Sequence, residues 1–526
     1  MAEEAVIFPD QPLFMVDRGW QRRKKRAAKN SPQAVHEREL DLQPSRVPEV
    51  TITVAKGPGS TRSTSPPERK KDHRLAKAQA KQHAPIQFMN YEPPTSKKKQ
   101  QHGPGGRAQT GTVHTGKSLY HDTAMKPKDI PRDLFILKKS LPGTATALYS
   151  VIDPEVSSFQ EFVGYYPTRM AAAMYPITKT VTLTHNPIET FWFPAVVKDE
   201  VSLHAILFSC AMHYFLGSGQ LTFRDSDLLM KVILNRLNRR LHEGKYSDLT
   251  IGAVSCLALC ENHLGNHPRW KMHAAGMSEM VRVRGGFQNV RDVLHMKIYR
   301  ADTIGAVDTL THPNFPRPTR TTQSLFDVLA IMPPANPIEP TLVNLGLTQT
   351  VLNALVELSH LCHALNQAAE KRIPVDPLAF DEDVTCIQHD LLRSISPDQE
   401  AVERLCVITA LIFVQTLTRE VPFTRLCSSH ISTQLKEALP AVKTAKAPAR
   451  LIFWILFMGG LVSKDTSERV WFRQKLTDFQ QLQNDWVQWE NVKARLQTVF
   501  WVNNLQDAFG LELWHDIDPS NRPACQ

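Results

Sequence analysis

The fold class follows from the stretch DEVSLHAILFSCAMHYFL, residues 199–216. When this stretch is wound as a helix, apolar side chains surround most of its circumference, which is the pattern of a helix buried on all sides. Outward from it, residues 228–241 place leucine, valine and isoleucine on one face of a second helix and Arg236, Arg239 and Arg240 on the other. A fully buried helix beside an amphipathic one predicts a body of stacked helical layers.

Capping residues set the limits of the next two helices. Ser247 can cap the start of a helix that stops at Gly265. Another helix follows Pro268 and can end at Gly285 and Gly286, because glycine readily takes the left-handed conformation that closes a helix.

A further helix-start signal precedes the apolar run LCVITALIFVQTL. Ser396, Pro397 and Gln399 have the spacing of a capping box with proline at the first helical position, so we expect a helix to begin there and to end before Pro422. Strand signal is confined to TVTLT, residues 180–184. We predict an all-α fold of about ten or more helices and, because no fixed-period repeat is present, no regular solenoid. The other expected helices are residues 288–312, 348–371, 449–462, 467–484 and 486–501.

Proline and charge divide the chain into two parts. Residues 1–133 carry 14 of the 36 prolines and 25 Lys and Arg against 14 Asp and Glu, whereas the remaining residues carry 37 against 38. Such a basic, proline-rich segment buries too little apolar surface to offset its ordering entropy, so we predict a disordered tail over 1–133. Residues 134–526 then form the all-α domain, with a linker or long loop at 313–340, where seven prolines fall.

A run of five basic residues lies near the start of the tail. Concentrated Lys and Arg in an extended chain suit the acidic grooves of a nuclear import receptor, and they equally suit nucleic-acid phosphate. A charge run can also do no more than solvate a tail. The residues that we expect to serve import or phosphate contact are Arg22, Arg23, Lys24, Lys25, Arg26 and Lys29.

Two patterns suggest chemistry without the context that the chemistry needs. GTVHTGKS, residues 111–118, fits the P-loop pattern, but no apolar strand precedes it and a poor helix follows. Cys256, Cys260, His263 and His267 are possible zinc ligands, but on one straight helix they form a stripe about 16 Å long, too extended to converge on an ion. We expect no bound nucleotide, other cofactor or metal.

Composition argues against further classes of protein. The longest strictly apolar run, LIFWILFMGGLV at residues 451–462, is shorter than the about 20 residues of a spanning helix, so we expect a buried core helix and no membrane partner. Eight cysteines, mostly in apolar helical patterns, favour reduced thiols in the cytosol or nucleus. No nucleophile elbow and no His-Glu-x-x-His pattern occurs, so we predict no catalytic residues.

Two stretches of the body carry a family resemblance. They are PRWKMHAAGMSEMVRVRGGF, residues 268–287, and ARLIFWILFMGGLVSKDTSERVWFRQKLTDF, residues 449–479, which is followed by FWVNNLQDAFGLELW. Together they resemble the helical regulatory domain of the fungal-specific transcription factor domain family. The opening FMVDRGWQRRKKRAAKNSP, residues 14–32, is similar to a short N-terminal motif of many members.

The resemblance implies a nuclear fungal regulator with an all-α, middle-homology-like domain. Trp270, His273, Gly285 and Gly286 match family positions, and we expect them to pack and cap helices. Many members also carry a zinc binuclear cluster of six closely spaced cysteines beside a basic stretch. The first cysteine of this sequence is Cys210, so that DNA-reading module is missing.

Three functions remain open at this point. We favour a nuclear transcription regulator whose helical domain binds a partner or an effector and whose tail associates weakly, or through a partner, with DNA. The alternative is an interaction scaffold that does not bind DNA, and an enzyme is the third and least supported function. The expected partners are an import receptor, DNA contacted without base selection or through a partner, and other transcription regulators, while the oligomeric state stays open.

Overall fold

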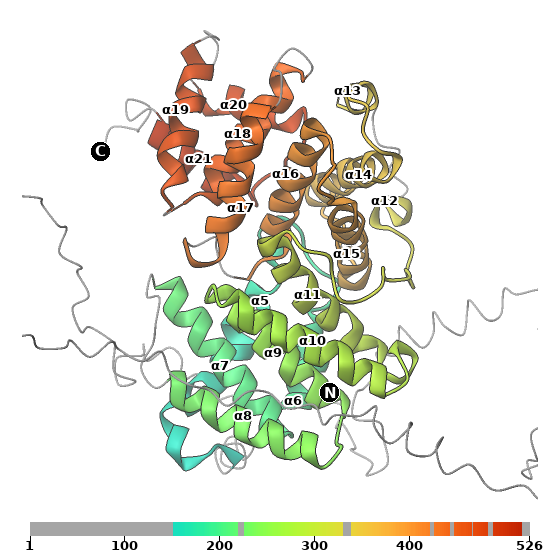
Figure 1. Cartoon of the computed structure of the whole chain (residues 1–526), viewed down its shortest axis with the longest axis vertical. Coiled ribbons are helices and arrows are strands. Elements are labelled where there is room, and N and C mark those ends of the chain that lie inside the picture. Colours follow the sequence, from blue (N-terminus) through green and yellow to red (C-terminus); the bar gives the residue numbers. More distant parts are fainter. Residues whose placement is uncertain are drawn as a thin grey trace, which may run out of the picture. The chain divides into compact units, whose positions relative to one another are not determined.

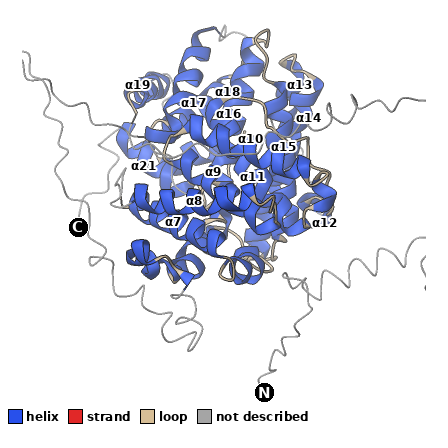
Figure 2. Cartoon of the chain, turned by 60° about the horizontal axis from the view of Figure 1, so that its bottom comes forward, coloured by secondary structure: helices blue, strands red, loops and turns tan. Residues whose placement is uncertain are grey.

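Helices make up most of the chain that the structure describes, and loops connect them (Figure 2). The computed structural model describes residues 151–218, 226–329, 338–420, 425–441, 447–464, 466–481 and 488–517, all within one unit, Ile86–Gln526. Within these ranges the strand signal at residues 180–184 yields only an isolated parallel bridge, Leu183 to Val375. The predicted all-α fold class is therefore confirmed, whereas the tail, residues 1–133, lies outside the described residues.

The helices follow one another along the chain as Figure 1 labels them. They are α5 (Ala171–Ala173), α6 (Phe193–Val196), α7 (Glu200–Gly217), α8 (Ser226–His242), α9 (Asp248–His263), α10 (His267–Val283), α11 (Asp292–Thr309), α12 (Leu325–Val328), α13 (Glu339–Asn344), α14 (Gln349–Lys371), α15 (Pro377–Ser394), α16 (Ala401–Thr418), α17 (Arg425–Ala438), α18 (Ala449–Val462), α19 (Glu468–Gln481), α20 (Trp489–Gln497) and α21 (Asp507–Ile517). Short 3-10 and π segments fill much of the chain between Pro154 and Trp192.

Helix α11 joins two groups of helices. In the first group, α9 packs against α7, α10 and α11 (Figure 1). In the second, α15 packs against α14 and α16, and α18 packs against α16, α17, α19, α20 and α21. Because α11 also contacts α15, α16 and α17, its residues meet both groups.

The predicted caps lie where the sequence placed them. The Ser247 hydroxyl accepts a hydrogen bond from the Thr250 amide at 3.2 Å, and α9 begins directly after it. Gly265 follows the end of α9 with φ of 75°, and Gly285 and Gly286 follow α10 with φ of 89° and 100°. These three left-handed glycines confirm the predicted helix ends.

The predicted start of α16 is wrong. The helix begins at Ala401 with Glu400 at its N-cap, whereas residues 396–399 form a turn in which the Gln399 amide donates to the Ser396 carbonyl at 3.4 Å. The reason is the preceding helix α15, which continues to Ser394. The residues of the supposed capping box are needed to reverse the chain between α15 and α16.

Helix α15 itself was not predicted. Its buried positions include Glu382, Asp383, Gln388 and His389, so polar side chains interrupt the apolar stripe by which a helix is recognised. Its start signal was present, since the Asp376 carboxylate accepts from the Leu378 amide at 2.9 Å and proline follows Asp376. Helix α21 was not predicted either.

The proline-rich break is a long loop only in part. Residues 313–324 have no regular structure and lie against α15, α12 follows them directly, and α13 begins at Glu339. Residues 330–337 lie outside the described ranges.

The apolar helices are core helices. Helix α16 is long and apolar enough to cross a membrane, but 78% of it is buried inside the protein. The apolar run at residues 451–462 lies in α18 and is almost entirely buried, as predicted. The described cysteines are likewise buried and carry free thiols: Cys210, Cys256, Cys260, Cys362, Cys386 and Cys406.

Replacing Gly305 with alanine should destabilise the body. A Cβ at Gly305 would lie 2.0 Å from the ring of Trp270, whose Nε1 donates to the Ala301 carbonyl at 2.9 Å and so holds the ring in place. We expect Gly305→Ala to lower the free energy of unfolding by about 1–3 kcal/mol, despite the better helix propensity of alanine. Chemical denaturation measures the change.

The matched control is Gly217→Ala in α7, where a Cβ would meet nothing within 4 Å. This variant should be as stable as the parent or slightly more stable. Equal stabilities for the two variants would contradict the proposed contact between α10 and α11.

Candidate regulatory site

A cluster of buried charges lies where α9, α11 and the end of α16 meet. The Arg419 guanidinium donates to both carboxylate oxygens of Asp308 at 2.5 and 2.6 Å, and the Asn262 amide donates to Asp308 at 2.7 Å. The Arg419 and Asp308 side chains are 2% and 0% exposed. A charge pair so far from water is stable only when both partners and their hydrogen bonds are in place.

The next residue along the chain extends the cluster. The Glu420 carboxylate lies 3.0 Å from His263 Nε2 and 3.7 Å from the Arg300 guanidinium. Burial alone would raise the pKa of Glu420, but the hydrogen bond from His263 and the charge of Arg300 lower it to about 2. Glu420 is therefore ionised, and it connects α9 to α11.

Arg300 is the centre of a second set of contacts. Its guanidinium donates to the Met174 carbonyl at 2.8 Å, lies 3.7 Å from Asp381 on α15, and covers the Tyr175 ring at 5.2 Å. The Tyr175 hydroxyl donates to Asp381 at 2.7 Å. Because Arg300 lies between Asp381 and Glu420, its positive charge is already matched by two carboxyl groups.

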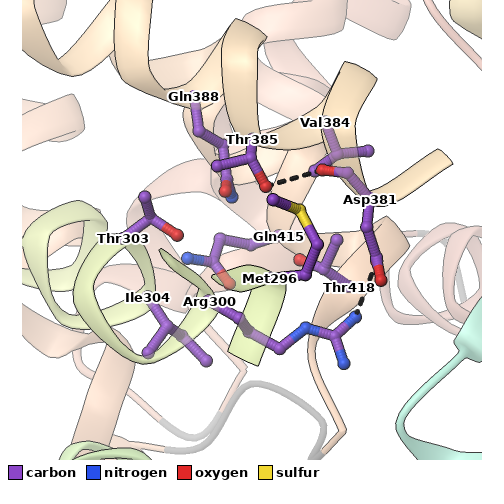
Figure 3. A pocket seen from close by; sticks show the side chains of 10 residues that line it. All are labelled: Met296, Arg300, Thr303, Ile304, Asp381, Val384, Thr385, Gln388, Gln415 and Thr418. Carbon is purple, nitrogen blue, oxygen red and sulfur yellow. Dashed lines mark hydrogen bonds and ion pairs between the residues drawn. The ribbon is translucent and has the colours of Figure 1, made fainter. Parts of the chain in front are cut away.

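A small cavity opens beside Arg300, and Figure 3 shows side chains that line it. They include Met296, Arg300 and Thr303 from α11, Asp381 and Gln388 from α15, and Gln415 from α16. Gln415 is 1% exposed, and neither atom of its amide group has a hydrogen-bond partner among the described residues.

The size of the cavity limits what it can hold. About 10 Å³ is open to the centre of a water molecule, which is room for roughly one water. Pockets for ordinary small ligands measure about 300–1,000 Å³. The cavity therefore suits a single water bound to the Gln415 amide and is no preformed effector pocket.

Two more buried carboxyl groups hold the loop that follows α11. Asp302 accepts from the Asn314 amide group at 2.7 Å and from the Phe315 backbone amide at 3.1 Å, and Asp383 accepts from the Leu325 amide at 2.8 Å. The hydrogen bonds favour the ionised form and lower the pKa of each carboxyl group, but burial has the larger effect and raises it to about 6.

Three of the four possible zinc ligands on α9 and α10 contact other protein side chains. Cys260 Sγ lies 3.1 Å from the Ser209 hydroxyl, His263 contacts Glu420, and His267 Nδ1 lies 3.2 Å from the Asn262 side chain. Among the residues that the structure describes, no group of three or more His, Cys, Asp or Glu side chains could hold a metal ion.

The residues predicted to serve import or phosphate contact lie outside the described residues, as does the P-loop-like stretch at residues 111–118. The sequence does not predict the cluster of Arg419, Asp308, Asn262, Glu420 and His263, which we call the buried centre. A signal was available, because Asp308 and Gln415 interrupt otherwise apolar helical runs, and an isolated polar residue at such a position needs a partner.

Removing the charge of Arg419 should be costly. Arg419→Met leaves Asp308 buried without its cation, and we expect the free energy of unfolding to fall by about 3–5 kcal/mol. The control is Lys464→Met, which breaks a pair with Glu512 whose members are 42% and 47% exposed, and which should cost less than about 1 kcal/mol. Similar losses in the two variants by chemical denaturation would contradict a structural role for the buried centre.

The stability of the protein should also depend on the protonation of Asp302. Its pKa is about 6 in the folded protein against an ordinary 3.8, so the stabilisation from its bound proton is complete below pH 4 and is lost as the pH rises through about 6. Between pH 7.5 and pH 5 the free energy of unfolding should therefore rise, with about 1 kcal/mol from Asp302. Asp302→Asn should remove that part, and an unchanged pH profile would contradict the assignment.

Comparison with known proteins agrees with this description. The model of the fungal-specific transcription factor domain matches residues 161–500, more than half of the chain, whereas no curated protein and no solved structure matches. Two family-matching side chains are structural, as expected: Trp270 is buried against α11, and burial lowers the pKa of His273 to about 4, so it is a neutral core histidine. The protein belongs to the fungal-specific transcription factor domain family, and this match indicates a transcription regulator.

Proposed function

We propose that this protein is a nuclear transcription regulator in which the basic tail and the helical body have separate roles. The tail, residues 1–133, contacts an import receptor and DNA phosphates, and the body binds another regulator. The single observation that carries the proposal is the charge distribution: the positive excess of the chain lies entirely in the tail. Sequence-independent affinity for nucleic acid comes mainly from such charge.

Ion pairs in the body support this division. Arg236 contacts Asp153 and Glu200 at 2.6 and 2.5 Å, and Arg240 contacts Asp199 at 2.7 Å. Because nearby carboxylates neutralise most of its charge, a paired guanidinium attracts phosphate only weakly. Arg236 and Arg240 therefore support a structural role, and the proposal assigns DNA contact to the tail.

The ligand of the body is a protein rather than a small effector in this proposal. The cavity beside Gln415 has room for roughly one water, which argues against an effector bound there. A partner that recognises specific DNA would supply the base contacts of the missing zinc cluster. The alternative is an interaction scaffold that does not bind DNA. The absence of any cysteine before Cys210 supports this alternative too.

Nuclear import should depend on the first basic run. Replacing the five residues Arg22–Arg26 with alanine should shift a fluorescently tagged protein towards the cytoplasm, because import receptors need concentrated charge. Replacing Lys97–Lys99 with alanine is the matched control and should change the distribution less. Unchanged nuclear accumulation of the first variant would remove the import role from this run.

Direct DNA binding should be weak and strongly salt-dependent. If Arg22, Arg23, Lys24, Lys25, Arg26 and Lys29 each neutralise one phosphate, the log–log salt slope should be about −5. The dissociation constant should be micromolar or weaker near physiological salt, with little preference among duplexes. A salt titration on several duplexes measures both quantities.

A truncated protein that lacks residues 1–133 is the control for this titration, and we expect it not to bind DNA. Tight, sequence-selective binding by the truncated protein would place a DNA reader in the body and contradict the division of roles.

A further inference from the structure

An acidic face on α15 holds the loop at residues 313–324, which we call the strap. The Glu382 carboxylate, only 2% exposed, accepts hydrogen bonds from the backbone amides of Thr321 and Thr322 at 2.9–3.0 Å. It also accepts from both threonine hydroxyls at 2.6 Å. One carboxylate thus fixes two successive residues of the strap through backbone and side chain alike.

Arginines of the strap extend this charge-based attachment. Arg320 pairs with Asp383 at 2.9 Å and with Glu357 on α14 at 2.7 Å. Arg317 donates to both oxygens of Asp390 at 2.7 and 2.8 Å. The strap therefore presents donors and cations to carboxylates, and additional negative charge on the strap would oppose every one of these contacts.

The strap covers an aromatic surface. Phe315 is 3% exposed, and its ring lies 5.2 Å from the ring of Phe287 and 6.2 Å from that of Tyr299. If the strap left α15 and carried Phe315 with it, the half-buried Phe287 ring and the buried Tyr299 ring would become more exposed.

The chemistry of a reversible release is available at the threonines. Thr321 is exposed and lies in a segment without helix or strand, so an enzyme can reach its backbone without unfolding a helix. A protein serine/threonine kinase would transfer the γ-phosphoryl group of ATP to the threonine oxygen, with ADP as the leaving group and the hydroxyl proton released. The product cannot donate to Glu382 and carries a charge of about −1.5 to −2.

We propose that phosphorylation of Thr321 or Thr322 releases the strap from α15 and uncovers Phe287 and Tyr299. The phosphate would lie within about 3 Å of the Glu382 carboxylate and close to Asp383, and the like charges would repel because water poorly screens a carboxylate that is only 2% exposed. Capture of Arg320 by the phosphate would weaken the attachment as well, since Arg320 would then leave Asp383. Both routes loosen the strap.

Hydrogen–deuterium exchange of the Thr321 and Thr322 amides in the full chain reports on the release, because these amides donate to Glu382. We expect the amides at positions 321 and 322 to exchange about tenfold faster or more in the double variant Thr321→Glu/Thr322→Glu, with exchange in α14 and α15 unchanged. Thr319→Glu is the matched control, because Thr319 is exposed and makes no hydrogen bond with Glu382. Thr321→Val/Thr322→Val removes the hydroxyls without adding charge and should have a smaller effect.

Two further measurements complete the test. Adding Glu382→Gln to the double glutamate variant should restore most of the protection, because it removes the repelling carboxylate. Peptide mapping of the protein from its own cells, with phosphatases inhibited, should find phosphate on Thr321 or Thr322. Exchange no faster than in Thr319→Glu would overturn the release, and strap peptides recovered only without phosphate would overturn the modification.

Discussion

The buried contact between Arg419 and Asp308 is the constraint on which the helical body depends. Two charges removed from water remain stable only while each keeps its partner, so the elements that carry them must keep one relative position. Arg419 follows α16, Asp308 belongs to α11, and Asn262, which also bonds Asp308, belongs to α9. Arg300 on α11 extends the same requirement to α15 through Asp381. Helix α11 is thus fixed by charge to both groups of helices and by the Trp270 ring to α10.

This arrangement separates the two halves of the proposed function. The charges of the body are used to fix helices and surface loops, as Arg300, Arg236 and the strap arginines illustrate. The body carries 37 Lys and Arg against 38 Asp and Glu, whereas the tail carries 25 against 14, an excess of positive charge that its own acidic residues do not balance. A body that binds a partner and a tail that binds phosphate without base selection account for a family member without a zinc cluster.

The sequence predicts those parts of the fold that follow from apolar periodicity and caps. The Ser247 cap, the glycine stops after α9 and α10 and the buried run in α18 depend on local physical chemistry, and each is confirmed. The start of α16 was wrong because residues 396–399 reverse the chain after α15. Helix α15 was missed because Glu382 and Asp383 are polar residues whose burial is stabilised by contacts with the strap. The buried centre was missed similarly, since nothing local pairs Arg419 with a residue 111 positions earlier. Contacts of this range are set by packing, which periodicity does not encode.

Genome-wide chromatin occupancy tests the central claim most directly, because it asks which part of the chain selects the sites. The comparison is between the tagged full chain and a chain in which residues 1–133 are replaced by an unrelated nuclear import signal. We predict that both proteins occupy the same sites and that the second is enriched less, since the partner of the body selects the sites and the tail adds affinity. Loss of all site preference in the second protein, or an absence of chromatin enrichment in both, would contradict the account.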